Sequence, residues 1–235
     1  MISIVNYILI CNGYKTIEIA QLLEGYSCFL FKPIDNKDEF FVTIESHSQS
    51  DDDAKNILEN KADELFDLIF SSNIVSPFFK KNCTLILCQE YSKIERSTIF
   101  QIEEDPYNFK KNVIVYSENE LNSLKDYLSK DNNISLTNEK INQIINSNNG
   151  SDFLNFKSNQ EKTDNYYSLI IKIILKLPFI TYIPQEQDLE NLEEEIYNSL
   201  SEKQKIIYEK LIDQDIEWNE NDIYKNVCSI WGETE

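Results

Sequence analysis

Histidine, arginine and glycine are scarce in this chain of 235 residues, which has one histidine, one arginine and four glycines. A nucleophile is usually activated by an adjacent general base, most often histidine. The one histidine, His47, lies in the polar segment SHSQSDDD, where we expect an ordinary surface side chain. Neither a Walker A loop nor a dinucleotide glycine fingerprint is present, and four glycines offer little material for a phosphate cradle. We therefore expect no enzyme activity and no cofactor.

Positive charge is also in short supply. The chain has 41 acidic residues against 22 lysines and arginines, a formal charge of −19. Phosphate backbones are bound by clustered basic residues, and the clearest candidates here are two short pairs, Lys80–Lys81 and Lys110–Lys111. We expect no direct nucleic acid binding by the chain alone. The acidic surface could complement a basic protein partner, imitate DNA, or only keep the protein soluble.

The five cysteines give no sign of a disulfide framework. Their number is odd and their spacing irregular, which is typical of reduced thiols in a cytoplasmic protein. Cys83 and Cys88 lie along a predicted strand, where we expect small core residues rather than zinc ligands. The longest apolar stretch, Leu169–Leu177, is interrupted by two lysines and is far shorter than the about 20 residues that span a bilayer. No membrane span is predicted.

The N-terminal half contains alternating strand and helix signals. Two aromatic and β-branched runs, 26–33 and 39–45, flank a polar turn and predict a hairpin. A helix begins at 51–53 with acidic residues at its positive end, and short apolar runs at 84–88 and 113–116 predict further strands. Ser117 and Glu120 form the signature of a helix capping box. The pattern predicts an α+β fold with an N-terminal mixed α/β part built on a small, mostly antiparallel sheet.

The composition of the chain changes twice after the N-terminal half, near residues 131 and 166. Residues 131–165 are rich in Asn, Ser, Lys and Asp, which predicts a polar linker or loop region with one short helix near 139–145. A helical C-terminal part follows, with an apolar helix over 166–177 ended by a proline. We therefore predict a mixed domain at 1–130, the linker at 131–165 and a helical region at 166–235. Further amphipathic helices are expected over 189–200, 202–213 and 222–231.

Three adjacent acids, Glu103, Glu104 and Asp105, form the one carboxylate cluster of chemical interest. They lie in TIFQIEEDPYNFKKNVIVYS and could in principle hold a divalent metal for hydrolysis. They could equally form a solvent-exposed turn set by Pro106, whose acids pair with lysine or with a partner. Aromatic residues framed by charges are also the composition that binding hot spots prefer. We favour the turn or the partner surface over catalysis and expect no bound metal.

The same segment carries a family resemblance. Residues 102–121, IEEDPYNFKKNVIVYSENEL, resemble a recurring element of the middle components of bacterial ABC-three-component defence systems. Lamassu-type anti-phage systems belong to that group. In those proteins an acidic EED stretch is followed by an aromatic residue, an FKK element and a short strand. The LKLPFI segment, Leu175–Ile180, resembles another feature of the group.

The resemblance implies a non-catalytic accessory subunit. Such a subunit would dock on a large Rad50/SMC-like ABC ATPase and help hold or gate an effector, such as a nuclease, until phage DNA is detected. The residues that the resemblance points to as partner-binding, or as maintaining the fold around such a surface, are Glu103, Glu104, Asp105, Tyr107, Phe109, Lys110, Lys111, Leu177, Pro178 and Phe179.

Two other functions remain open from the sequence. One is an acidic inhibitor that imitates DNA, for which the acids after residue 185 supply charge. Its binding should be relieved by salt. The other is a metal-dependent hydrolase that uses Glu103, Glu104 and Asp105.

Overall fold

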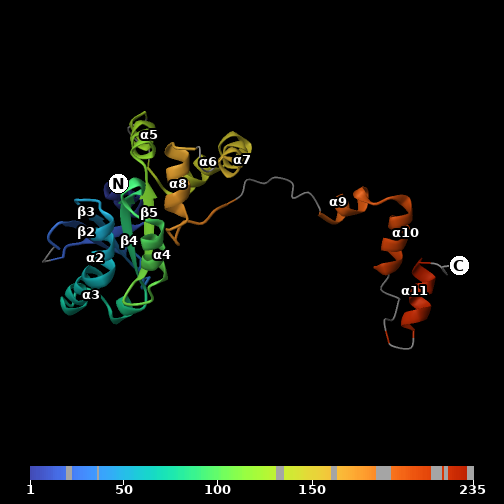
Figure 1. Cartoon of the computed structure of the whole chain (residues 1–235), viewed down its shortest axis with the longest axis horizontal. Helices are drawn as coiled ribbons and strands as arrows, with labels where there is room; N and C mark the ends of the chain where they lie inside the picture. The colour runs from blue at the N-terminus through green and yellow to red at the C-terminus, as the bar shows by residue number, and fades with distance from the viewer. Residues whose placement is uncertain are drawn as a thin grey trace. The chain divides into compact units, whose positions relative to one another are not determined.

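The computed structural model describes residues 1–19, 23–35, 37–130, 135–159, 163–183, 192–212, 219 and 222–231. The chain divides into two compact units, Met1–Gln185 and Glu186–Glu235, called here the N-terminal and the C-terminal unit (Figure 1).

The N-terminal unit is built on one five-stranded sheet in the order β1-β2-β3-β4-β5. The first two pairs are antiparallel and the last two are parallel. The predicted α+β fold is confirmed, and so is the hairpin, which is formed by β2 and β3; with two antiparallel and two parallel pairs, the sheet is mixed. Helices connect β3 to β4 and β4 to β5, and a helical crossover returns the chain in the same direction. The strands are β1 (Tyr14–Ile17), β2 (Tyr26–Pro33), β3 (Phe40–Ser46), β4 (Cys83–Glu90) and β5 (Lys110–Tyr116).

One face of the sheet is covered by the crossover helices. The first of these crossover helices, α2, has Ser50 as its N-cap, and the Ser50 side chain accepts a hydrogen bond from the Asp53 amide in a capping box. Ile57, Leu65 and Ile69, which share the predicted helical spacing, are all buried against strand residues of this face. The elements on this side are α2 (Asp51–Asn56), a π-helical turn (Ile57–Lys61), α3 (Ala62–Ser71), short 3₁₀ turns (Pro77–Lys80 and Tyr91–Lys93) and α4 (Arg96–Glu104).

The opposite face is covered by α1 and by helices that follow β5. Because successive strand residues point to opposite faces, Phe41 and Ile86 belong to this second core while Val42 and Leu85 belong to the first. The apolar start of the chain forms a helix that the sequence patterns did not single out. The elements are α1 (Ile2–Cys11), α5 (Glu118–Ser129), α6 (Asn138–Ile145), a 3₁₀ turn (Ser147–Gly150), α7 (Ser151–Ser158) and α8 (Tyr166–Ile174).

The predicted helices at 139–145 and 166–177 are confirmed as α6 and α8, both of which contribute to this core. Residues 131–134 and 160–162 of the predicted linker lie outside the described residues. Helix α8 belongs to the N-terminal unit, which extends to Gln185, and its side chains contribute to the core on this face of the sheet. The division at 130 and 165 stays a prediction.

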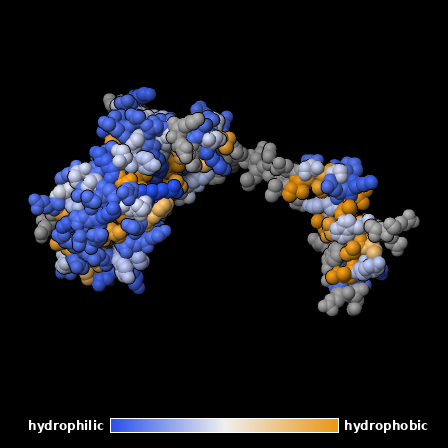
Figure 2. All heavy atoms as spheres, viewed as in Figure 1, coloured by the Kyte–Doolittle hydropathy of each residue, from blue (hydrophilic) through white to orange (hydrophobic). Residues whose placement is uncertain are grey.

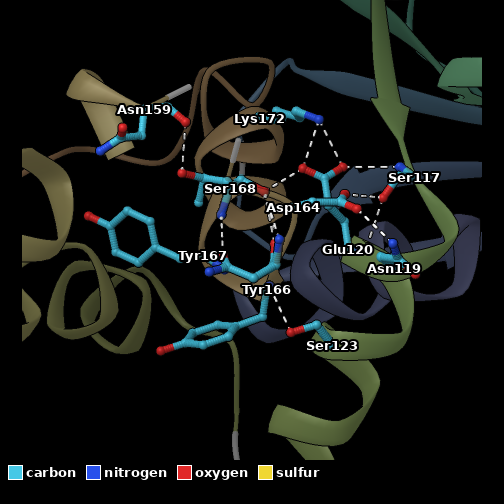
Figure 3. Close-up of polar contacts among 12 residues, drawn as sticks. Ser117, Asn119, Glu120, Ser123, Asn159, Asp164, Tyr166, Tyr167, Ser168 and Lys172 are labelled. Carbon is cyan, nitrogen blue, oxygen red and sulfur yellow. Dashed lines mark hydrogen bonds and ion pairs between the residues drawn. The ribbon is translucent and has the colours of Figure 1, made fainter. Parts of the chain in front are cut away.

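A buried polar junction fixes α8 to α5 (Figure 3). The side chain of Glu120 is 1% exposed, accepts from Ser168 Oγ and lies 2.8 Å from Lys172 Nζ. Asp164 accepts from Ser117 Oγ and, at 2.8 Å, from Asn119 Nδ2. These two hydrogen bonds lower the pKa of Asp164. The predicted capping box at Ser117 thus also holds the start of α8.

The C-terminal unit contains α9 (Leu192–Ser199), α10 (Glu202–Leu211) and α11 (Ile223–Trp231), which confirms the three predicted helices. Lys210 Nζ donates to the Ser229 carbonyl at 2.8 Å and joins α10 to α11. The predicted starts and ends at 189–191 and 213 lie outside the described residues. Over the parts that the structure describes, no helix has the length and apolarity that a bilayer crossing requires.

Candidate partner-binding site

Two segments singled out in the sequence meet at one corner of the N-terminal unit. Lys176 Nζ lies 2.6 Å from Glu103 Oε1, although the two residues are 73 positions apart. Asn112 Nδ2 donates to the Lys176 carbonyl at 2.8 Å. We call residues 102–111 and 175–179 together the α4–β5 corner. The structure therefore brings the EED/FKK segment and the LKLPF segment into direct contact.

Glu103 supports the corner from within. It lies in the last turn of α4, and its carboxylate accepts from the Val113 amide at 2.8 Å as well as pairing with Lys176. Among the described residues, strand β5 is an edge strand of the sheet, so its outward amides have no neighbouring strand there. Glu103 satisfies one of these amides. It fastens α4 and the segment after α8 to the edge of the sheet.

Lys111 is a buried cation that holds the loop between α4 and β5. The residue is 3% exposed, and its Nζ lies 2.5 Å from both Asp105 Oδ2 and the Tyr107 carbonyl. A buried ammonium is tolerated only when charge and hydrogen bonds replace its lost hydration. The carboxylate and the carbonyl supply both here. The contacts of Lys111 therefore hold loop 105–109 in place.

The same loop turns one aromatic ring inward and another outward. Asn108 has a φ of +61°, in the left-handed region that asparagine tolerates better than most residues. After this reversal Phe109 is buried, with its ring centroid 5.3 Å from that of Phe66 and 6.0 Å from that of Phe79. Tyr107 is 72% exposed. Burial of one ring thus positions the other at the surface.

The second segment is anchored in the opposite core. Leu177 is buried, and the Phe179 ring packs 4.9 Å from Tyr14 and 5.4 Å from Phe41, centroid to centroid. Pro178 between them is exposed. Leu177 and Phe179 therefore position Pro178 beside β5.

Four of the ten predicted site residues are exposed, namely Glu104, Tyr107, Lys110 and Pro178. Among the described residues, no hydrogen bond or ion pair occupies the side chains of Glu104 and Lys110. Glu104 ends α4, where the helix dipole disfavours a negative charge. A hollow of about 420 Å³ adjoins this surface and is lined by Lys110, Pro178, Asp38, Glu39, Lys81, Asn82, Cys83 and Thr84.

The three carboxylates proposed for hydrolysis do not share one partner. Glu103 is engaged by Lys176 and Asp105 by Lys111, while Glu104 faces solvent. Over the described ranges, no group of three or more His, Cys, Asp and Glu side chains is arranged to hold a metal ion. A metal at this cluster would have to displace two lysines. The hydrolase stays a prediction with little support from this geometry.

The other candidate reactive groups also occupy ordinary structural positions. Cys83 and Cys88 are buried in opposite cores, and burial raises the pKa of both thiols. They cannot share a ligand because the sheet separates them. His47 is exposed, with its Nε2 3.1 Å from Ser27 Oγ.

Comparison with known proteins gives a family match that includes residues 102–111 of the corner but not residues 175–179. Searches of curated proteins and of solved structures both returned no match. One family model matches, and the matched region runs from just before β3 to just after α6, including the whole EED/FKK segment. The family expected from residues 102–121 is therefore confirmed for residues 39–148, which match the model of the ABC-three component (ABC-3C) system Middle Component 1.

Proposed function

We propose that this chain is a non-catalytic accessory subunit of an anti-phage system of the Lamassu type. It docks through the α4–β5 corner on an SMC/Rad50-like ABC ATPase in the cytoplasm and helps hold or gate an effector nuclease. Support comes from the match of residues 39–148 to a middle-component family. Such a component is by definition one part of a multi-component system.

One observation carries the choice of surface: Tyr107 projects from a loop whose base is fixed by the buried Lys111. Tyrosine is enriched among hot-spot residues, and it is most effective where little conformational freedom is lost on binding. The exposed Glu104 and Lys110 flank it with opposite charges. This combination fits a surface that recognises a partner by an aromatic anchor and a charge pattern.

The ten candidate residues then divide into two roles. Glu104, Tyr107, Lys110 and Pro178 contact the partner, because their side chains are accessible. The other six residues hold these four side chains in position through their buried contacts and ion pairs. These supporting residues are Glu103, Asp105, Phe109, Lys111, Leu177 and Phe179.

The charge of the chain supports a basic partner. A formal charge of −19 repels nucleic acid but attracts proteins that carry DNA-binding lysines and arginines. An ATPase that grips DNA presents such surfaces. The accessory subunit would therefore approach the ATPase rather than the DNA.

The test is co-expression of the tagged chain with its genomic neighbours, followed by affinity capture, size exclusion and mass spectrometry. We expect a stoichiometric ABC ATPase with the wild type and at least about tenfold less with Tyr107→Ala or Lys110→Glu. Tyr91→Ala is the matched control, because Tyr91 is also an exposed tyrosine of the same unit.

Recovery of the chain without any ATPase would overturn the proposed assembly. Equal recovery of the ATPase with Tyr107→Ala, Lys110→Glu and Tyr91→Ala would exclude the corner as the docking surface.

The DNA-mimic hypothesis keeps one specific observation in its favour. The C-terminal unit has 15 acidic residues and four lysines, a formal charge of −11 in 50 residues. A mimic would compete with duplex DNA for a nuclease, and the competition would weaken steeply as salt rises. An unchanged nuclease rate in the presence of excess chain would eliminate it.

A further inference from the structure

A second hollow, of about 390 Å³, lies where strands β1 and β2 meet the turn that leads into β3. Its walls come from β1, from β2 and the turn after it, from the start of β3, and from the segment between α3 and β4. None of the ten candidate residues of the α4–β5 corner lines it. We call it the β1–β2 hollow. Pockets that hold small molecules have volumes of roughly 300–1,000 Å³, so its size fits such a ligand.

Positive charge gathers around the β1–β2 hollow. Three lysines line it, Lys15, Lys32 and Lys37, in a unit whose formal charge is −8. Lys15 and Lys32 lie directly opposite each other on the antiparallel strands β1 and β2. Side chains paired in this way share one face with their Cβ atoms about 5 Å apart, and like charges in such a pair destabilise a sheet. The pair therefore weakens the sheet unless an anion lies between the two ammonium groups.

The acids of the hollow do not neutralise this pair. Two aspartates also line it, and one of them, Asp35, pairs with Lys37 at 3.1 Å. Asp38 is then the one carboxylate of the hollow that faces two lysines. Among the described residues, the ammonium groups of Lys15 and Lys32 have neither an ion pair nor a hydrogen bond. With three lysines against two aspartates, the hollow is positive within a negative unit.

Protection of the sheet edge does not explain the pair. Among the described residues β1 is an edge strand, and a lysine on an edge discourages pairing with another sheet. Lys15 fits that role. Lys32 does not, because β2 has a neighbouring strand on each side. A lysine opposite Lys15 on an inner strand adds repulsion without protecting an edge, so the pair indicates an anionic ligand.

The chemistry of the hollow fits a phosphate ester that carries an apolar or aromatic group. A phosphate monoester has about 1.5 to 2 negative charges at pH 7 and three strong acceptor oxygens, which matches two neighbouring ammonium groups better than a single carboxylate does. Much of the remaining wall is apolar and consists of Pro33, Ile34, Phe40 and Ile74. Ile34 is 65% exposed, although the face of the N-terminal unit in Figure 2 is mostly hydrophilic. Apolar walls with a few placed polar groups are typical of small-molecule sites.

We propose that the β1–β2 hollow binds a mononucleotide. Its phosphate lies between Lys15 and Lys32, and its base covers Ile34 and Ile74. The sequence contains no phosphate-binding loop because the positive charge is assembled from separate strands. The site uses none of the residues proposed to dock on the ATPase, so it does not depend on that function.

The test is isothermal titration calorimetry of the full chain with adenosine monophosphate, inorganic phosphate and adenosine. We expect saturable binding of the nucleotide, weaker binding of phosphate and the weakest binding of adenosine. Lys15→Gln and Lys32→Gln should each weaken nucleotide binding at least about tenfold, because each removes one charged contact to the phosphate. Ile34→Ala should weaken nucleotide binding about fivefold and leave phosphate binding unchanged, because it removes apolar contact with the base.

Two controls separate a ligand site from a structural role and from general attraction. Lys125→Gln removes an exposed lysine of α5 that does not line the hollow and should leave nucleotide affinity unchanged. Without ligand, Lys15→Gln should leave the urea midpoint unchanged or raise it, because repulsion between the paired lysines is relieved. A lower midpoint would show that Lys15 supports the fold and would overturn the proposal. Tyr107→Ala should leave nucleotide binding intact, so this result is independent of the pull-down of the ATPase.

The titrations can also overturn the proposal directly. No saturable binding of the nucleotide, undiminished binding to Lys32→Gln, or equal affinities for adenosine monophosphate and adenosine would each do so. A single-stranded DNA of ten nucleotides with a 5′-phosphate is the last probe. If it bound at least about tenfold more tightly than adenosine monophosphate, the ligand would be a nucleic acid rather than a mononucleotide.

Discussion

Helices α8 and α11 have the same length, yet their surroundings differ. Each spans nine residues. In α8 six of the nine are buried, since the helix lies between the sheet, α5 and α6. In α11 one is buried. Periodicity therefore identifies both helices but does not reveal whether anything covers the apolar face. Coverage depends on the neighbouring elements, and the described residues of the C-terminal unit include no sheet against which α11 could pack.

The charged residues differ in the same way. Eight of the nine ion pairs among the described residues lie in the N-terminal unit. There Glu103, Asp105 and Glu120 each pair with a lysine that fixes one element to another. Among the described residues of the C-terminal unit, one ion pair occurs, Lys205–Glu202, and it joins neighbours on one helix. Ion pairs thus fix elements to one another in the N-terminal unit.

The largest expected difference between α8 and α11 is tested by making the same isoleucine-to-alanine substitution in each helix. Ile173→Ala on α8 removes a side chain that is 0% exposed and should cost about 2–5 kcal/mol, from lost burial and the cavity left behind. Ile223→Ala on α11 should change the free energy of unfolding by no more than about 0.5 kcal/mol. Urea unfolding of both variants checks this. Similar losses of unfolding free energy for the two variants would show that the apolar face of α11 is covered in the free chain.

The next effect concerns the two adjacent lysines of the corner. Lys111→Met leaves the partly buried Asp105 unpaired and releases loop 105–109, which should cost about 2–3 kcal/mol. Lys110→Met is the matched control and should stay within about 0.5 kcal/mol, because Lys110 is exposed without an ion pair among the described residues. Urea midpoints of the two variants provide the measurement. A cost for Lys110→Met as large as that for Lys111→Met would refute the supporting role of Lys111.

The smallest effect is expected in acid. Hydrogen bonds from Ser48 and Ser50 lower the pKa of Asp53, and those from Ser117 and Asn119 lower the pKa of Asp164. Because the folded pKa lies below the unfolded value of about 3.9, each carboxylate stabilises the fold above that value. This contribution, less than about 1 kcal/mol for such accessible groups, is lost as pH falls through the folded pKa.

Urea unfolding at pH 7 and near pH 3 measures this loss, with Asp164→Asn as the test variant. The variant should lose part of the pH dependence that the wild type shows. An identical pH dependence in both proteins would mean that Asp164 contributes nothing.

Several elements could be predicted from the sequence because their signals are local. The hairpin of β2 and β3, the capping box of Ser117 and Glu120, and the helices at α6 and α8 all depend on residues near one another in the chain. The parallel direction of β4 and β5 could not be predicted this way. It follows from where the crossover helices pack, and that packing involves residues far apart in the sequence.

The candidate site shows the same division. The EED/FKK segment was recognisable as a surface turn with aromatic residues, and Tyr107 and Phe109 were equivalent candidates in the sequence. Tyr107 is exposed and Phe109 is buried because Asn108 has a left-handed backbone conformation and because the Phe109 ring packs against Phe66, more than 40 residues earlier. Neither the conformation of Asn108 nor the contact with Phe66 has a sequence signal that distinguishes the two aromatic residues.

The sequence by itself determined the acidity of this protein, the hairpin of β2 and β3, helices such as α6 and α8, and a family resemblance carried by residues 102–121. Only the tertiary structure decided that Lys111 is a buried support while Lys110 faces solvent, and that Glu103 pairs with Lys176. The physical reason is that burial and ion pairing depend on which distant segments come together, whereas periodicity and capping depend on a few neighbouring residues.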